Sequence, residues 1–141
     1  MNERINDKLE EIEEFLSILL DIIPNSFEEY KSNYEKKWSC EKGFQNIIEA
    51  ITDVSFLMIN EKRLNEPKDD LNAFEILSKK GLITEVLYKK FKEAKGMRNI
   101  LAHEYGKIDD EIVFNAIKSE LEKDANEFVS AIRSALREEG G

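Results

Sequence analysis

Apolar residues recur along the chain at helical spacing, and the first stretch shows the pattern most clearly. Between residues 5 and 23 the steps from one apolar position to the next alternate between four and three, which keeps a single stripe on one side of a helix. This stripe consists of Ile5, Leu9, Ile12, Leu16, Leu19 and Ile23. Pro24 helps to end the helix, because proline cannot donate the next backbone hydrogen bond. Ser26 followed by Glu29 has the spacing of a capping box, which predicts that a second helix begins here.

The second predicted helix is long and runs from about residue 27 to residue 60. Its later apolar stripe consists of Phe44, Ile47, Ile51, Val54 and Met58. A break near Ser39 is an open alternative, because serine is a good N-cap and Gly43 weakens a helix interior by about 1 kcal/mol relative to alanine. A loop containing Pro67 follows between residues 61 and 70.

Three further helices are predicted after this loop. The first is short and ends at Gly81, and its apolar positions are Leu71, Phe74 and Leu77. Thr84 can cap the next, which has Gly106 as a natural stop and an apolar stripe made of Leu87, Phe91, Ala94, Met97 and Leu101. Asp109 can cap the last, whose inward positions are Val113, Ile117, Leu121, Phe128 and Ile132. Short connections favour antiparallel neighbours, so we expect an all-α, up-and-down bundle of about four long helices plus a short one, forming a single domain over residues 1–141.

The composition agrees with a helical fold and excludes several classes of protein. Only six glycines and two prolines occur in 141 residues, which is unlike a turn-rich β protein. The single cysteine, Cys40, excludes an internal disulfide and a cysteine-based zinc site. The charged N-terminal residues lack the apolar stretch of a secretion signal, and no apolar run approaches the roughly 20 residues that span a bilayer. We therefore expect a cytoplasmic protein that does not enter a membrane.

Charge is distributed unevenly along the chain. The net charge of -9 argues against a surface built throughout for nucleic acid, because phosphates are repelled by the average surface. Residues 79–107 instead carry eight basic and three acidic side chains, a net charge of +5. Taken alone, this segment is most simply interpreted as a solvated, lysine-rich helix face.

The basic segment leads into a cluster of polar side chains at a predicted helix end. Residues 96–106 contain an arginine, an amide, a carboxylate, a phenol and the only histidine of the chain. At 100° per residue, Arg98 and Tyr105 lie about 20° apart on an ideal helix and share a face. Arg98 and His103 differ by about 140°, so they converge only if the last turn unwinds or if a second subunit completes the site. Asn99 lies four residues before His103 and can hold the imidazole in one tautomer.

Each of these side chains has an ordinary explanation when taken alone. A histidine such as His103 interacts favourably with a helix C-terminus, a tyrosine such as Tyr105 is usually a packed ring, and an arginine such as Arg98 usually forms a surface ion pair. The joint pattern Arg-x-x-x-x-His-x-Tyr is what suggests a function. It resembles the signature of the HepT branch of the HEPN proteins, and it reads here as Arg98-Asn99-Ile100-Leu101-Ala102-His103-Glu104-Tyr105.

The resemblance covers roughly residues 1–135, and it includes the stretch from Phe44 to Asp53 and the acidic start of the last predicted helix near Asp109. It implies a HEPN-like bundle that acts as a homodimer, with two copies of the motif in a cleft between protomers. Phe56 and Ile100 are candidate interface residues. It also implies a metal-independent ribonuclease toxin that needs no cofactor and whose partners are the RNA substrate and a minimal nucleotidyltransferase antitoxin.

The resemblance assigns a role to each residue of the motif. His103 would transfer protons as general acid or base, Arg98 would stabilise the charge on the phosphorane-like transition state, and Asn99 would orient His103. The hydroxyl of Tyr105 would accept AMP from the antitoxin, which adds bulk and negative charge to the cleft. The candidate RNA-binding residues are Lys92, Lys95 and Lys107.

Three other interpretations stay open. The same cleft could hold a nucleotidyltransferase or a nucleotide without cleaving RNA, which would make the protein a non-catalytic binding module. A plain four-helix bundle explains the composition but gives no reason for the clustered polar helix end. A phosphotransfer protein would use a lone histidine, but that histidine should lie in the middle of an exposed helix, whereas His103 lies close to Gly106.

Overall fold

Helices form the whole of the regular structure in the part of the chain that the structure describes. The computed structural model describes residues 2–140 and all of their side chains except those of residues 2, 105, 139 and 140. In chain order the elements are α1 (Asn2–Ile22), α2 (Phe27–Ser32), α3 (Tyr34–Glu61), α4 (Asp70–Lys79), α5 (Glu85–His103), the 3-10 turn η1 (Tyr105–Lys107), α6 (Asp110–Asn115), the π-helical segment η2 (Ala116–Leu121) and α7 (Glu122–Gly140). The predicted all-α class is confirmed.

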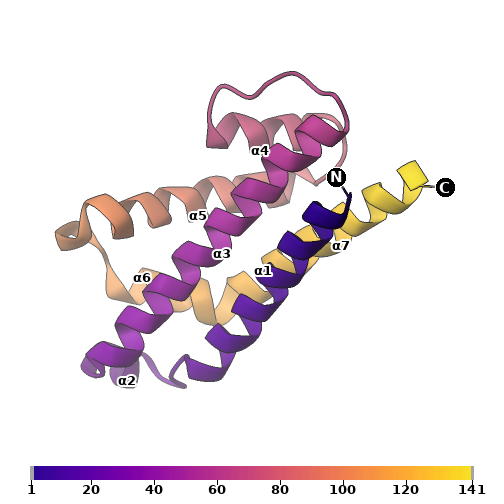
Figure 1. Cartoon of the computed structure of the whole chain (residues 1–141). Helices are drawn as coiled ribbons and strands as arrows, with labels where there is room; N and C mark the ends of the chain where they lie inside the picture. Colours follow the sequence, from indigo (N-terminus) through magenta and orange to yellow (C-terminus); the bar gives the residue numbers. More distant parts are fainter. Residues whose placement is uncertain (1, 141) are drawn as a thin grey trace.

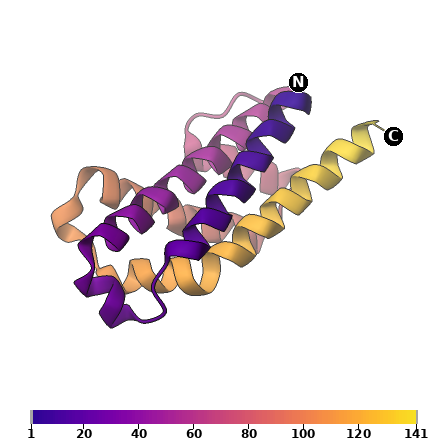
Figure 2. The ribbon, with the colours of Figure 1, turned by 60° about the horizontal axis from the view of Figure 1, so that its bottom comes forward.

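The long helices pack as antiparallel neighbours (Figure 1). α1 packs along α3, α7 packs against α1, and α5 lies against α3 and the short α4. Two views agree that α1 begins and α7 ends at one end of the bundle, whereas the last turn of α5 lies at the other end (Figures 1 and 2). None of the helices between residues 2 and 140 combines the length and the apolar character needed to cross a bilayer.

Most of the predicted apolar positions lie in or against the core, but Leu71, at the start of α4, is exposed. All six positions of the α1 stripe and all five of the α3 stripe are buried. Phe91 ties α5 into this core, because its ring centroid lies 5.5 Å from that of Phe74 on α4 and 5.3 Å from that of Phe128 on α7. Aromatic pairs of this kind contribute about 0.5 to 1.5 kcal/mol beyond their buried area. The position of α5, which carries the motif, is therefore set by core packing.

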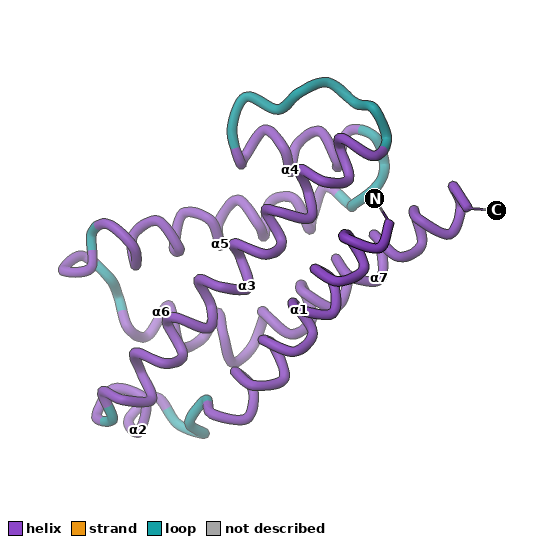
Figure 3. The backbone as a smooth tube through the Cα atoms, in the orientation of Figure 1, coloured by secondary structure: helices purple, strands orange, loops and turns teal. Residues whose placement is uncertain are grey.

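Side-chain caps mark most of the helix starts that the sequence predicts. Ser26, Thr84 and Asp109 each accept a hydrogen bond from a backbone N–H in the first turn of the helix that follows. The long second helix is broken, but the predicted place near Ser39 is wrong. The break lies at Asn33, whose Oδ1 accepts a hydrogen bond from the backbone N–H of Lys36 at 3.1 Å, because asparagine is a strong N-cap. The longest connection follows α3 and appears as the large teal loop in Figure 3.

The last predicted helix is not one regular α-helix, which corrects the expectation. A π-helical segment, η2, separates α6 from α7. The buried positions explain it, since they follow one another at four-residue steps as Val113, Ile117, Leu121 and Ala125. Three such steps turn an α-helical stripe by about 120°. The wider π turn takes up this rotation and keeps all four side chains in the core.

An ion pair joins α1 to α7 and predicts a pH-dependent contribution to stability. Arg133 donates two hydrogen bonds to the carboxylate of Glu13, at 2.9 and 2.7 Å. These hydrogen bonds, together with the charge of Arg133, hold the pKa of Glu13 below its ordinary value despite some desolvation. A lowered carboxyl pKa stabilises the fold at neutral pH, and this stabilisation is lost as the pH falls through the folded-state pKa.

We expect Glu13→Gln to lower the free energy of unfolding at pH 7 by only about 0.5 kcal/mol, because both partners are more than one-third exposed. The difference from the wild type should shrink as the pH falls from about 4.3, the ordinary glutamate pKa, through the lowered value. Urea unfolding at pH 7 and at pH 3 measures both quantities. Glu14→Gln, on the exposed side of the same helix, is the control. A deficit that is the same at both pH values would contradict the assignment.

Candidate functional site

The motif straddles the end of α5. The helix ends at His103, and the backbone N–H of Glu104 caps it by donating to the carbonyl of Ile100 at 2.8 Å. Tyr105 already belongs to the 3-10 turn η1. The prediction that this helix runs to Gly106 is therefore wrong, and the 20° relation between Arg98 and Tyr105, which assumes a continuous helix, does not hold. The side chain of Tyr105 lies outside the described residues.

Arg98 is anchored to a neighbouring helix. Its Nη2 donates to Oε2 of Glu49 on α3 at 2.6 Å. The Arg98 side chain is 20% exposed and that of Glu49 is 52% exposed, so the guanidinium lies in a shallow surface position. Within the described part of the chain, its buried Nε has no acceptor. The guanidinium is thus held by one carboxylate and keeps donor capacity for a further anionic group.

The amide of Asn99 also contacts Arg98. Its Oδ1 accepts a hydrogen bond from Nη1 of Arg98 at 3.3 Å. The prediction that Asn99 orients His103 has no contact to support it among the interactions of the described residues. Asn99 instead helps Glu49 to fix the plane of the guanidinium. A fixed plane matters because an arginine grips two phosphate oxygens only when its fork is aligned with them.

His103 is exposed at the last turn of α5. Since α5 stays helical through this residue, the turn between Arg98 and His103 does not unwind. The two side chains therefore leave the helix about 140° apart. Two arrangements could bring these side chains to one phosphate, and the structure excludes the one in which the last turn of α5 unwinds. The other arrangement, in which a second copy of the chain completes the site, stays a prediction.

The three candidate RNA-binding lysines lie in different surroundings. Lys92 is exposed, and Lys107 is exposed and pairs with Glu104 at 3.2 Å. Lys95 is different, because its side chain is only 8% exposed and its Nζ lies 2.7 Å from a carboxylate oxygen of Asp70 on α4. A buried, paired ammonium does not reach an RNA phosphate without breaking its ion pair. We therefore remove Lys95 from the RNA-binding set and assign it to the packing of α4 against α5.

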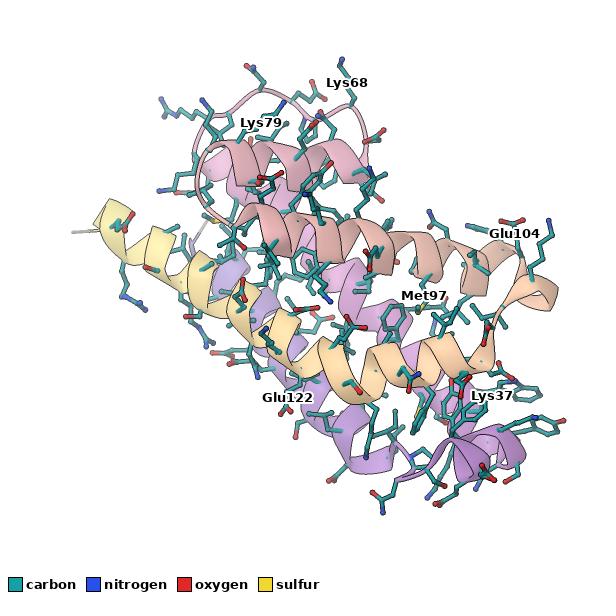
Figure 4. The ribbon with its side chains drawn as sticks, turned by 180° about the vertical axis from the view of Figure 1, so that it is seen from behind. Lys37, Lys68, Lys79, Met97, Glu104 and Glu122 are labelled. Carbon is teal, nitrogen blue, oxygen red and sulfur yellow. The ribbon has the colours of Figure 1, made fainter. Side chains whose placement is uncertain are left out.

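A pocket lies beside α5, but the motif does not line it. It is bounded by Met97 and Lys90 of α5, by Ala116 and Glu120 of η2 and by Phe44 of α3. Figure 4 shows Met97 between α5 and the last part of the chain, whereas Glu104 lies at the exposed end of the helix. Arg98, Asn99 and His103 lie outside this pocket, on the surface. Such a position suits a long polymer better than a small enclosed ligand.

Glu49 is the residue of the site that sequence reasoning did not identify. It lies in the stretch from Phe44 to Asp53 that carries part of the family resemblance, and its exposed carboxylate on an amphipathic helix was the only local signal. Its role depends on a contact with Arg98 across 49 residues of sequence. A contact of that kind comes from the packing of α3 against α5.

Comparisons with known proteins agree on one family. A model of the family described as "Ribonuclease HepT-like" matches residues 5–132. The tRNA nuclease HepT of Aphanizomenon flos-aquae is 30% identical over 119 residues, covering 84% of this chain and 81% of that protein. The mRNA nuclease HepT of Shewanella oneidensis is 25% identical over 134 residues, covering 95% of this chain and 99% of that protein.

A solved structure gives the same picture. The tri-AMPylated HEPN toxin of Shewanella oneidensis, in complex with its MNT antitoxin, is similar to this chain with a TM-score of 0.88 and 25% sequence identity. The similarity covers 95% of this chain and 99% of that chain. The helical arrangement described above is therefore shared over almost the full length of both.

Proposed function

Because the chain belongs to the HepT-like ribonuclease family, we propose that it is a metal-independent RNA endonuclease toxin that acts in the cytoplasm and reacts through Arg98 and His103. The observation that carries this proposal is the anchored guanidinium. Arg98 is fixed by Glu49 at 2.6 Å on the surface of the bundle, five residues before the only histidine of the chain. RNA cleavage requires an oriented cation for the developing charge and an imidazole for proton transfer, and this surface provides both groups.

The reaction uses the nucleophile that RNA itself supplies. The 2′-hydroxyl loses its proton and its oxygen bonds to the adjacent phosphorus, while the bond from phosphorus to the 5′-oxygen breaks and that oxygen takes up a proton. The products are a 2′,3′-cyclic phosphate and a free 5′-hydroxyl. His103 moves protons in this exchange, because the imidazole ring can both accept and donate a proton. Arg98 balances the negative charge that grows on the non-bridging oxygens.

The proposed site is shared between two copies of the chain. Arg98 and His103 of one copy diverge on the same regular helix, so a homodimer that brings two α5 ends together supplies both groups to one phosphate. Ile100, which is half-buried in the last turns of α5, and Phe56, which is exposed on α3, are the interface residues that we propose. The exposed Lys92 and Lys107 are proposed to attract the RNA backbone near this cleft.

The reaction is tested with purified protein and a labelled RNA oligonucleotide in buffer containing EDTA. We expect cleavage to proceed in the chelator and to leave a 2′,3′-cyclic phosphate end. A matched oligonucleotide with 2′-O-methyl groups should stay intact, because the nucleophile is blocked. Cleavage of the methylated strand, or activity that returns only with a divalent cation, would contradict the mechanism. Binding without any cleavage would instead favour a non-catalytic binding module.

The proposed partner is a minimal nucleotidyltransferase antitoxin that transfers AMP from ATP to the hydroxyl of Tyr105. The related toxin from Shewanella oneidensis is tri-AMPylated and bound to an MNT antitoxin. In this chain Tyr105 lies in the 3-10 turn directly after the last turn of α5. An adenylate on Tyr105 would add a negatively charged phosphate beside the path of the RNA, and this charge would repel the RNA phosphates.

Modification is expected to depend on Tyr105 alone among the tyrosines of the chain. After co-expression with the nucleotidyltransferase encoded next to it, the intact mass should rise by one or more adenylates, and peptide sequencing should place them at Tyr105. Tyr105→Phe should keep its unmodified mass and remain toxic despite the partner. Tyr34→Phe, an exposed tyrosine on α3, is the control. Neutralisation of the toxin with Tyr105 unmodified would overturn this assignment.

A further inference from the structure

An exposed pair of stacked aromatic rings lies at the start of α3. Tyr34 is 64% exposed and Trp38 is 60% exposed. Their ring centroids are 6.1 Å apart and the planes differ by 21°, so the rings stack nearly parallel. Large aromatic side chains are usually well buried, which makes an exposed pair informative. The two rings pack on each other and add little to the core.

The pair lies on the face of α3 that also carries Glu49. Trp38 and Glu49 are eleven residues apart, which places them within about 20° of each other and about 16 Å apart along the helix axis. Lys42 lies between them, one turn beyond Trp38, and is exposed. Since Glu49 holds Arg98, the aromatic rings, a lysine and the anchored guanidinium follow one another along this face.

The start of α3 lies at the same end of the molecule as the last turn of α5 (Figure 4). Lys37, adjacent to Trp38 in sequence, forms an ion pair at 3.0 Å with Asp110, at the start of α6. Figure 4 shows Lys37 and Glu104 at the same end of the molecule. The Nζ of Lys37 also lies 5.8 Å from the centre of the Tyr34 ring, which links the aromatic pair to the start of α6 through the Lys37–Asp110 ion pair. A strand bound at the end of α5 would be within reach of them.

The side chains next to the aromatic pair on α3 favour nucleic acid over protein as the molecule that binds there. The positions around the rings are exposed and polar or charged: Glu35, Lys36, Ser39 and Lys42. The buried centres of protein interfaces are depleted in lysine and glutamate. Stacked aromatic rings with lysines beside them are instead the usual platform for unpaired bases, because every base has a face that can stack.

We propose that Tyr34 and Trp38 form a stacking platform for bases of single-stranded RNA, a few nucleotides from the phosphodiester that Arg98 contacts. The proposal rests on the ribonuclease function proposed above and adds a substrate class to it, namely unpaired RNA. Lys42 lies beside the backbone of the bound strand between the platform and the reacting phosphate. Double-stranded RNA, whose bases are stacked on each other, cannot use the platform.

Trp38 is the only tryptophan of the chain, so its fluorescence reports on the platform directly. The experiment titrates the full-length His103→Ala variant, which binds without cleaving, with a fluorescein-labelled single-stranded RNA. We expect Trp38 emission to be quenched at the same RNA concentrations at which the anisotropy of the label rises. The additional substitution Trp38→Ala should weaken binding by about tenfold, whereas Trp38→Phe should largely retain it. Val86→Ala removes another apolar side chain, which is 70% exposed, and should leave binding unchanged.

Each other outcome overturns the proposal in a recognisable way. If His103→Ala binds RNA equally well with and without Trp38→Ala, and RNA does not quench the emission of Trp38, the stacking platform does not exist. If sedimentation shows that Trp38→Ala dissociates the dimer, this face of α3 is an interface between copies of the chain. If Trp38→Ala no longer co-purifies with the nucleotidyltransferase but keeps its affinity for RNA, this face of α3 is the antitoxin-binding surface. If the wild type fails to cleave any RNA, the proposed function fails. If the wild type cleaves and Trp38→Ala binds equally well, only the platform fails.

Discussion

Replacing His103 or Arg98 with alanine is expected to lower the rate of RNA cleavage by at least about a hundredfold and to abolish growth arrest. Loss of a positioned acid or base costs roughly 10²- to 10⁴-fold, and loss of a transition-state charge partner costs roughly 10²- to 10³-fold. Arg98→Lys should recover little, because an ammonium lacks the planar fork. The measurement is the single-turnover rate on a labelled RNA in EDTA, with circular dichroism to check folding.

Two matched variants make this result specific. Arg133→Ala removes an arginine that is also paired with a glutamate, but at the α1 and α7 contact, and it should cleave at the wild-type rate. Glu49→Gln keeps the shape of the side chain that holds Arg98 and removes its charge, so an intermediate loss is expected. Full activity of purified His103→Ala or Arg98→Ala would reject the proposed roles. A loss that also occurs in Arg133→Ala would indicate a general effect of stability.

Mixing two inactive variants is expected to restore activity if the site is shared between copies. In a dimer of one Arg98→Ala chain and one His103→Ala chain, one of the two composite sites still contains an intact arginine and an intact histidine. Because one of its two sites works, a purified mixed dimer should have about half of the wild-type activity. The measurement is cleavage by the co-expressed variants, purified through two different affinity tags so that only mixed dimers are assayed.

The alternative arrangement gives a clearly different result. If each site lies within one protomer, every site in the mixed dimer lacks one of the two groups, and activity stays at the level of the single variants. A mixed dimer of His103→Ala with Arg133→Ala tests the assay itself, because the Arg133 variant retains both reacting groups and its arginine lies away from the site. Sedimentation at micromolar concentration establishes whether the dimer exists at all. A monomer that cleaves RNA would remove the shared site.

The sequence was sufficient for the local features of the fold. Apolar spacing and capping residues act over three or four positions, so the α1 stripe and the caps at Ser26, Thr84 and Asp109 could be predicted without any tertiary information. The misplaced break shows where such local signals are insufficient. Both Asn33 and Ser39 can cap a helix, and the core decides between them, because Cys40 and Phe44 must face inward on one continuous helix.

The π-helical segment has a signal in the sequence. Four buried positions at regular four-residue steps, from Val113 to Ala125, do not fit an α-helical stripe. The predicted stripe passes directly from Leu121 to Phe128, a seven-residue step that fits an α-helix, because it does not include the small residue Ala125. A small apolar residue can carry the period of a helix as well as a large one.

The motif could be found from sequence, but its surroundings could not. Arg98, Asn99 and His103 are close in sequence and stand out by residue type. The carboxylate of Glu49 meets Arg98 only because α3 packs against α5. Burial of Lys95 beside Asp70 has the same origin, since a lysine in a basic segment looks exposed until α4 covers it. Helical periodicity does not predict the contacts between helices, and these contacts decide which partner each charged side chain has.

The start of α1 and the end of α7 lie together, at the end of the bundle opposite the last turn of α5 (Figures 1 and 2). A fluorescent protein fused at either position would extend away from the cleaving surface and from the aromatic rings of α3. The distribution of the enzyme in living cells can therefore be imaged while the RNA path stays open. The same geometry favours surface immobilisation through a terminal linker, with every captured molecule presenting its reactive side to solution.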